Sequence, residues 1–271
     1  MINQSNSFKS DSCETKGQKP DLKISKLGIV SRDYNKVRDF SQSLPEVLKI
    51  LDENKCDAVL FSLFSIIPRV SFDVQACLKN LDNIRAVMIE EFQESRGDKK
   101  RDPIRYIVYH KIKDNWHEYE FRQHFGSLKG KFNGEKVDIP SFVENKIRKR
   151  LLGNFCILLC GESNIVKHSK KDNEVQDPYH FNNAIPGEIK IILNPIHDRM
   201  RRPEMKLKRI FLSKNNRWVV SVWNKGKANN NNGKVWKENG PAWTVFHNEK
   251  PIDVKIIPNE LGVEFGILQI D

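Results

Sequence analysis

The chain has 271 residues, of which 38% are hydrophobic, and its formal net charge is +11 with a pI near 9.3. Five cysteines without a C-x-x-C pair argue against a disulfide framework and a zinc site, and no apolar run reaches the length of a membrane span. We predict a cytoplasmic protein without a cofactor, with a disordered tail over residues 1–21 and one domain over 22–271.

The first part of the chain predicts strands and helices in alternation. Residues 22–30 end in a short apolar run and predict a strand. Ser43 and Glu46 have the spacing of a capping box, which predicts a helix start. The continuous apolar run at 56–64 is typical of a strand covered on both faces. Apolar residues at helical spacing over 74–92 then predict a second, long helix.

The second part predicts mostly strands. Residues 104–110 and 116–125 flank a polar turn and predict a strand pair. A short helix is expected over 141–152, and Asp198 is placed to cap a helix over 201–215. Further strands are expected at 154–160, 188–194, 217–224, 242–247 and 263–271. This order argues for an α/β sandwich with a mixed sheet.

Several segments together resemble the carbon-nitrogen hydrolase (nitrilase) superfamily. They are CDAVLF at 56–61, NFCILLCGES at 154–163, EIKIILNP at 188–195, RWVVSVWNKG at 217–226, GPAWTVFHNEKPI at 240–252 and ILQID at 267–271. They run in the family's order from about residue 22 to the C-terminus. The resemblance implies an α/β, nitrilase-like α-β-β-α sandwich with mixed sheets, which in the family often pairs into a dimer.

The resemblance also implies a Glu-Lys-Cys triad, in which the cysteine is the nucleophile. Cys160 matches that cysteine. The glutamate should end the strand at 56–61, but Ser62 follows there, and Arg122 or Gln123 stands near the position of the lysine. The family triad is therefore degenerate. An arginine at the lysine position is still able to hold an oxyanion.

A relocated acid-base group has several candidates, which are Glu162, His124 and the carboxylates of Glu118, Glu120 and Glu135 on the neighbouring strand and loop. Glu162 lies two positions after Cys160. The alternative interpretation is that Glu162 is a solvated loop residue without a catalytic role. His124 lies on a predicted strand and would form a Cys-His pair with Cys160. The alternative interpretation is that His124 is a hydrogen-bonded structural histidine. His197 and Asp198 follow a buried strand, where family members place loops that contact the substrate, although Asp198 also fits a helix cap.

Basic residues are concentrated in a few clusters, which are candidates for nucleic-acid binding or simply solvated surface. The candidate contacts are Lys146, Arg148, Lys149, Arg150, Arg199, Arg201, Arg202 and Lys206. Aromatic residues are not interleaved with them, which argues against a stacking platform for single strands.

Three functions follow from these observations. The first is a nitrilase-like protein with a degenerate triad that works by binding, as a partner subunit or homodimer; the resemblance extends to domains beside reverse transcriptases in bacterial anti-phage defence. The second is an active amidase that takes a small amide-like ligand, with Cys160 as nucleophile and a relocated acid-base group. The third is a basic, nucleic-acid-binding accessory protein. The side chains around the Cys160 sulfur decide between the first two.

Overall fold

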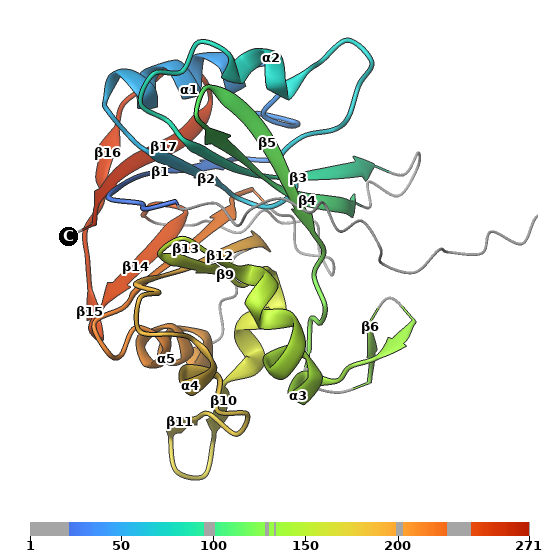
Figure 1. Cartoon of the computed structure of the whole chain (residues 1–271), viewed down its shortest axis with the longest axis vertical. Helices are drawn as coiled ribbons and strands as arrows, with labels where there is room; N and C mark the ends of the chain where they lie inside the picture. The colour runs from blue at the N-terminus through green and yellow to red at the C-terminus, as the bar shows by residue number, and fades with distance from the viewer. Residues whose placement is uncertain are drawn as a thin grey trace, which may run out of the picture.

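Two β-sheets face each other across an apolar core, and helices cover the outer side of each sheet (Figure 1). The computed structural model describes residues 22–94, 101–127, 130–132, 134–198, 203–226 and 240–270. The tail predicted over 1–21 lies outside the described residues. The predicted α-β-β-α sandwich with mixed sheets is confirmed by this arrangement.

The first sheet has seven strands in the order β16-β17-β1-β2-β3-β4-β5. Its strands are β1 (Lys26–Arg32), β2 (Ala58–Phe61), β3 (Ala86–Glu94), β4 (Arg101–Ile112), β5 (Asn115–Phe121), β16 (Lys255–Ile257) and β17 (Val263–Gln269). β1, β2 and β3 run parallel to one another, and the remaining pairs are antiparallel. The sheet is therefore mixed.

The second sheet has six strands in the order β15-β14-β13-β12-β9-β8. Its strands are β8 (Leu151–Leu152), β9 (Phe155–Ile157), β12 (Ile191–Asp198), β13 (Trp218–Asn224), β14 (Trp243–His247) and β15 (Lys250–Pro251). β9, β12 and β13 are parallel, so their carboxyl ends lie at one edge of the sheet. Two short hairpins pair β6 (Lys131–Phe132) with β7 (Glu135–Lys136), and β10 (Lys167–Ser169) with β11 (Glu174–Gln176).

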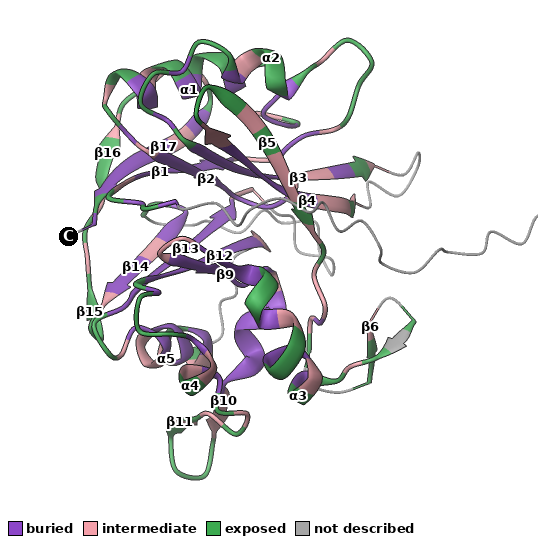
Figure 2. Ribbon diagram, viewed as in Figure 1, coloured by how far each residue is buried: buried purple, intermediate pink, exposed green. Residues whose placement is uncertain are grey.

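The helices pack against the two outer faces. α1 (Leu44–Glu53) and α2 (Val74–Leu78) cover the first sheet. The second sheet is covered by α3 (Ile139–Ser141), η1 (Phe142–Lys146), η2 (Ile147–Arg150), α4 (Phe181–Ala184) and α5 (Pro203–Leu212), while the short 3₁₀ helix η3 (Cys160–Ile165) follows β9. Buried residues fill the strands of both sheets, and the outward sides of α1 and α2 are exposed (Figure 2). Among the described residues, no helix is long and apolar enough to cross a membrane.

The central core lies between the sheets. It combines apolar residues of the first sheet, such as Leu60 and Met88, with residues of the second, such as Leu193 and Val220. At one end the sheets also touch through backbone, since Lys225 N donates to Arg32 O at 2.8 Å and Tyr34 N donates to Lys225 O at 3.1 Å. This backbone contact places the residue after β13 beside the end of β1.

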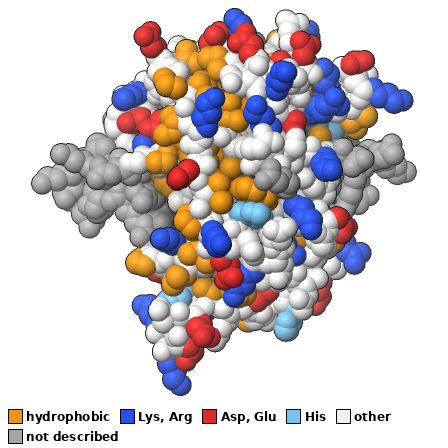
Figure 3. Space-filling model, turned by 90° about the vertical axis from the view of Figure 1, so that its left-hand side faces the viewer, with side chains coloured by type: hydrophobic (Ala, Val, Ile, Leu, Met, Phe, Trp, Pro, Cys, Tyr) orange, Lys and Arg blue, Asp and Glu red, His pale blue; other side chains and the backbone are white. Residues whose placement is uncertain are grey.

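Apolar side chains also gather in a band on the face of the molecule that carries β15 and β16 (Figure 3). Ile256, on the edge strand β16, is 53% exposed. Lysine and arginine side chains lie along the band in the same view. The homodimer expected from the sequence stays a prediction.

Three local expectations were wrong. A long helix was expected over 74–92, but the helix α2 ends at Leu78 and the strand β3 occupies the second half of that range. Because both faces of β3 are buried, apolar residues occupy nearly every position, and a helical subset of them matches by coincidence. Ser43 precedes α1 but makes no capping hydrogen bond with its side chain. Asp198 ends β12, whereas α5 begins only at Pro203.

Candidate active site

Cys160 lies where β9 gives way to η3, with its side chain half-buried between the two sheets. Its φ of 39° is in the left-handed region, which a residue with a side chain rarely adopts and which is often found at functional sites. The thiol packs against the central core and against Ile196, Trp223 and Ala242. Asn194 fixes the turn by donating from Nδ2 to Cys160 O at 3.3 Å.

His197 reaches the Cys160 thiol from the neighbouring strand β12. Because β9 and β12 are parallel, the ends of both strands meet at the same edge, and the His197 ring lies against the Cys160 side chain. The ring also packs against Phe64, with centroids 3.9 Å apart and the two ring planes tilted by 37°. Its backbone is held as well, since Tyr34 donates from its hydroxyl to His197 O at 3.0 Å. The imidazole is thus fixed from three sides.

Glu90 supplies a carboxylate behind the histidine. It lies on β3, its side chain is only 4% exposed, and its Oε2 is 3.0 Å from His197 Nε2. The same oxygen accepts a hydrogen bond from Phe64 N at 2.7 Å. Cys160, His197 and Glu90, here called the Cys-His-Glu set, therefore form one chain of interacting side chains that crosses from the second sheet to the first.

The negative charge of Glu90 stabilises a positive charge on His197. Burial by itself would lower the pKa of His197, but the Glu90 carboxylate and Cys160 outweigh it and raise that pKa to about 10. His197 is therefore a cation at neutral pH, and its positive charge lies next to the Cys160 sulfur. In contrast, burial raises the pKa of the Cys156 thiol and of the Cys56 thiol to about 12, so those two cysteines are inert.

Ser62 takes the position that the family resemblance gives to the glutamate. It is buried directly after β2, and its hydroxyl donates to Asn224 Oδ1 at 2.7 Å. Asn224 in turn donates from Nδ2 to Leu63 O at 2.7 Å and to His197 O at 3.3 Å. The end of β2 thus supplies a neutral network that supports His197, while the carboxylate comes from the next strand.

Comparison with known proteins gives fold-level similarity alone. No protein-family model and no curated protein matches this sequence. Among solved structures, a carbon-nitrogen hydrolase from Helicobacter pylori G27 has 10% identity and a TM-score of 0.47, and covers 92% of this chain and 90% of its own. An amidase from Nesterenkonia sp. AN1, a cysteine-to-alanine mutant in complex with butyramide, has 12% identity and a TM-score of 0.48, covering 93% and 94%.

A third similar structure is a glutamine-dependent NAD(+) synthetase from Cytophaga hutchinsonii. It has 9% identity and a TM-score of 0.45, and covers 92% of this chain but 43% of its own.

Glu162 and Arg150 form a buried ion pair on the side of η3 that faces the segment after β5. Glu162 Oε1 accepts from Arg150 Nη2 at 2.9 Å and from His124 N at 2.7 Å, and Oε2 accepts from Leu159 N at 2.8 Å. Burial raises the pKa of Glu162, and Arg150 opposes that rise. Both oxygens of Glu162 are thus used to anchor the turn that carries Cys160.

The other predicted site residues are spread over the molecule. The His124 ring lies near Phe142, with centroids 5.4 Å apart, and Arg122 is exposed while its carbonyl accepts from Arg150. His197, predicted to bind substrate, lies directly against the nucleophile candidate, and Asp198 is the last residue of β12.

The candidate nucleic-acid contacts divide into three groups. Arg148 and Lys149 are exposed, as is Lys206 on α5, and Lys146 is half-buried. Arg150 is a correction, because its side chain is 1% exposed and binds Glu162, so it is not part of a surface cluster. Arg199, Arg201 and Arg202 lie outside the described residues.

Glu90 is the functional residue that the sequence reasoning missed. The signal was present, because a carboxylate inside the apolar run AVMIEEF is buried in a strand and then needs a partner. Interpreting 74–92 as a helix hid this signal, since a helix offers such a residue a solvated face.

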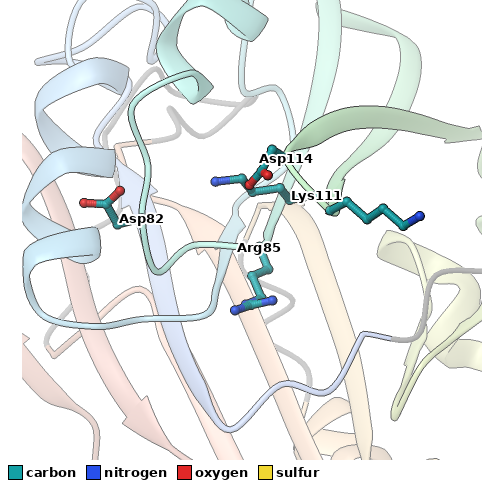
Figure 4. Close-up of a pocket in the computed structure, with 5 residues that line it drawn as sticks. Asp82, Arg85, Lys111 and Asp114 are labelled. Carbon is teal, nitrogen blue, oxygen red and sulfur yellow. The ribbon is translucent and has the colours of Figure 1, made fainter.

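A polar hollow lies elsewhere on the first sheet. It is lined by Asp82, Arg85, Lys111, Lys113 and Asp114, which come from the loop before β3, the end of β4 and the turn between β4 and β5 (Figure 4). Lys111 donates from Nζ to Leu81 O at 2.8 Å. None of the predicted site residues lines this hollow. Among the described residues, no cluster of His, Cys, Asp and Glu is placed to hold a metal ion.

Proposed function

We propose that the chain is a cysteine-dependent hydrolase that cleaves the carbon–nitrogen bond of an amide. Cys160 is the nucleophile, His197 transfers protons, and Glu90 orients His197. The observation that carries the proposal is the placement of His197 between the Cys160 side chain and the Glu90 carboxylate, which lies 3.0 Å from His197 Nε2. The sequence resemblance to carbon-nitrogen hydrolases supports the choice of an amide over other carbonyl substrates.

The chemistry of the Cys-His-Glu set is balanced within the set. The Cys160 thiolate attacks the carbonyl carbon, the C–N bond breaks, and His197 gives its proton to the leaving nitrogen. The resulting thioester is then attacked by water, which loses a proton to the neutral His197. Breaking the C–S bond releases the carboxylic acid and restores the thiolate and the imidazolium. The net reaction consumes one amide and one water.

The first prediction concerns the reactivity of Cys160. Iodoacetamide at neutral pH should alkylate Cys160 well before Cys77, because Cys160 lies against the positively charged His197 ring whereas burial raises the pKa of the Cys77 thiol. Peptide mass spectrometry over a time course measures both rates in the same sample. Equal rates at the two cysteines, with the protein folded, would count against an activated thiolate.

Hydrolysis itself is tested with a panel of short aliphatic amides, aryl amides and N-carbamoyl amines, by following amine or ammonia release. The wild-type chain should turn over at least one member, and Cys160→Ala should abolish that turnover. Cys77→Ala is the matched control and should leave turnover unchanged.

The binding function is kept as a second candidate because Ser62 stands where the family resemblance calls for a glutamate. In that case Cys160→Ala leaves the activity in the cell intact, and no amide in the panel is hydrolysed. The partner, including a reverse transcriptase in an anti-phage setting, stays a prediction. Loss of function in a folded Cys160→Ala variant would favour the hydrolase.

A further inference from the structure

The Tyr106 hydroxyl is a buried polar group without a hydrogen-bond partner in the described structure. Tyr106 lies on β4, is 1% exposed, and its side chain belongs to the core between the two sheets. A buried hydroxyl left unsatisfied costs about 1–3 kcal/mol, so each such group in a folded protein needs an explanation. Phenylalanine would fill the same space without that cost.

Tyr106 lies beside the Cys-His-Glu set. It is directly opposite Glu90 in the antiparallel β3–β4 pair, and side chains at such positions lie on the same face of the sheet, about 5 Å apart at Cβ. The Cys160 thiol packs against the core cluster that contains Tyr106. The hydroxyl is thus on the active side of the first sheet, not under its helices.

The charge state of Tyr106 suits a hydrogen-bond donor. Burial raises the pKa of the Tyr106 hydroxyl well above 10, the Glu90 carboxylate raises it further, and Arg150 partly opposes the shift. The phenol therefore keeps its proton throughout the working pH range. Glu90 is already engaged with His197 and Phe64 N, and the phenol is not bonded to it.

We propose that the Tyr106 hydroxyl donates a hydrogen bond to the carbonyl oxygen of the bound amide, at the site where Cys160 attacks. This inference rests on the proposed hydrolase function and names the donor that it needs. A neutral donor in a water-excluded site stabilises the oxygen as negative charge develops on it. No bond to the phenol is broken, because the proton stays on Tyr106.

The test compares Tyr106→Phe with Tyr109→Phe. Tyr109 lies on the same strand, but its side chain packs on the opposite face, under the helices, so it is a matched control. The probe is chloroacetamide, whose carbonyl oxygen would accept from Tyr106, and the rate of Cys160 alkylation is measured by mass spectrometry. A second probe, 2,2′-dithiodipyridine, reacts with thiolates and has no carbonyl.

We expect Tyr106→Phe to slow alkylation of Cys160 by chloroacetamide about 3- to 10-fold, the effect of one hydrogen bond. The rate with 2,2′-dithiodipyridine should not change, and Tyr109→Phe should match the wild type with both probes. Because the lost hydroxyl has no internal partner, the melting temperature of Tyr106→Phe should stay the same or rise.

Three results would overturn the inference. Tyr106→Phe reacting with chloroacetamide at the wild-type rate would show that the hydroxyl does not contact the amide. Equal slowing with both probes would show a general effect on the thiol. A clear fall in melting temperature would show an internal partner. Failure of the hydrolase proposal looks different, because wild-type Cys160 then reacts no faster than Cys77, and the Tyr106 role falls with it.

Discussion

At the scale of single residues, the site is decided by which groups surround one thiol. Cys160 is half-buried, strained in its backbone and in contact with His197, whereas Cys56 and Cys156 are fully buried. The difference between a reactive and a structural cysteine is thus set by neighbours, not by residue type. His197 owes its positive charge to Glu90, which makes Glu90 the residue to change first.

Glu90→Gln should lower the pKa of His197 from about 10 towards or below the ordinary value, because burial then acts without the opposing carboxylate. Any hydrolysis that needs the imidazolium should be lost at a lower pH in the variant. Alkylation of Cys160 at neutral pH should slow, because the neutral imidazole of the variant no longer places a positive charge beside the sulfur. NMR titration of the histidine ring and the pH dependence of alkylation measure these effects.

Glu91→Gln is the matched control for that experiment. Glu91 is the next residue on β3, points to the opposite face and binds Arg105 at 2.6 Å. It should leave the pKa of His197 and the alkylation rate unchanged. An unaltered His197 titration in Glu90→Gln would contradict the Cys-His-Glu set.

The same ion pair links stability to pH. Because the folded-state pKa of His197 is raised above the unfolded value of about 6.5, its contribution to stability is complete below pH ~6.5 and is lost as the pH rises through about 10. Breaking the buried pair in Glu90→Gln should cost about 3 kcal/mol of unfolding free energy at neutral pH. Chemical denaturation at several pH values measures both trends.

At the scale of elements, the turn from β9 into η3 is held by backbone packing and by one buried ion pair. The glycine that follows Cys160 has a physical reason, since a Cβ on Gly161 would lie 2.3 Å from Gly126 O. The carboxylate that follows it is bound by Arg150, which lies at the end of η2. In the sequence Cys-Gly-Glu, the glycine thus allows close packing against the backbone of Gly126, and the glutamate holds the turn through Arg150.

Gly161→Ala should destabilise the protein by at least ~2 kcal/mol, because the atom it meets is backbone and the two segments must separate. Alkylation of Cys160 should slow as well, since the turn that aims the thiol at His197 is displaced. Gly187→Ala is the control, because a Cβ there meets nothing within 4 Å. Thermal melting and the labelling time course test both effects, and equal melting temperatures for the two variants would contradict this account of the turn.

At the scale of the whole molecule, the two facing sheets bring together residues that are far apart in the chain. The net charge of +11 favours binding to negatively charged partners. Arg148 and Lys149 are exposed next to the buried Arg150, so the basic cluster there is smaller than its sequence indicates. Nucleic-acid binding stays a prediction that rests on these exposed residues.

If the cluster binds nucleic acid, the affinity for a labelled duplex should fall steeply with added salt. The double change Arg148→Ala and Lys149→Ala should then weaken binding. It should also reduce the slope of log affinity against log salt concentration by about 2, because two phosphate contacts are lost. Lys170→Ala with Lys171→Ala is the control, since both lysines are exposed on the β10–β11 hairpin. Fluorescence anisotropy at several salt concentrations measures the slope, and a salt-independent affinity would end the idea.

The sequence by itself determined the layers of the fold and the nucleophile candidate, because the buried strands and the apolar segment that leads from β9 to Cys160 have local apolar patterns. It did not determine β3, because a strand that is buried on both faces lacks the alternation of apolar and polar residues that distinguishes a strand from a helix. Only the tertiary structure decided the partners of the thiol. His197 and Glu90 are 107 positions apart, and parallel pairing within each sheet and the facing of the two sheets bring them to 3.0 Å. That proximity is set by strand order and register, which no local pattern of side chains contains.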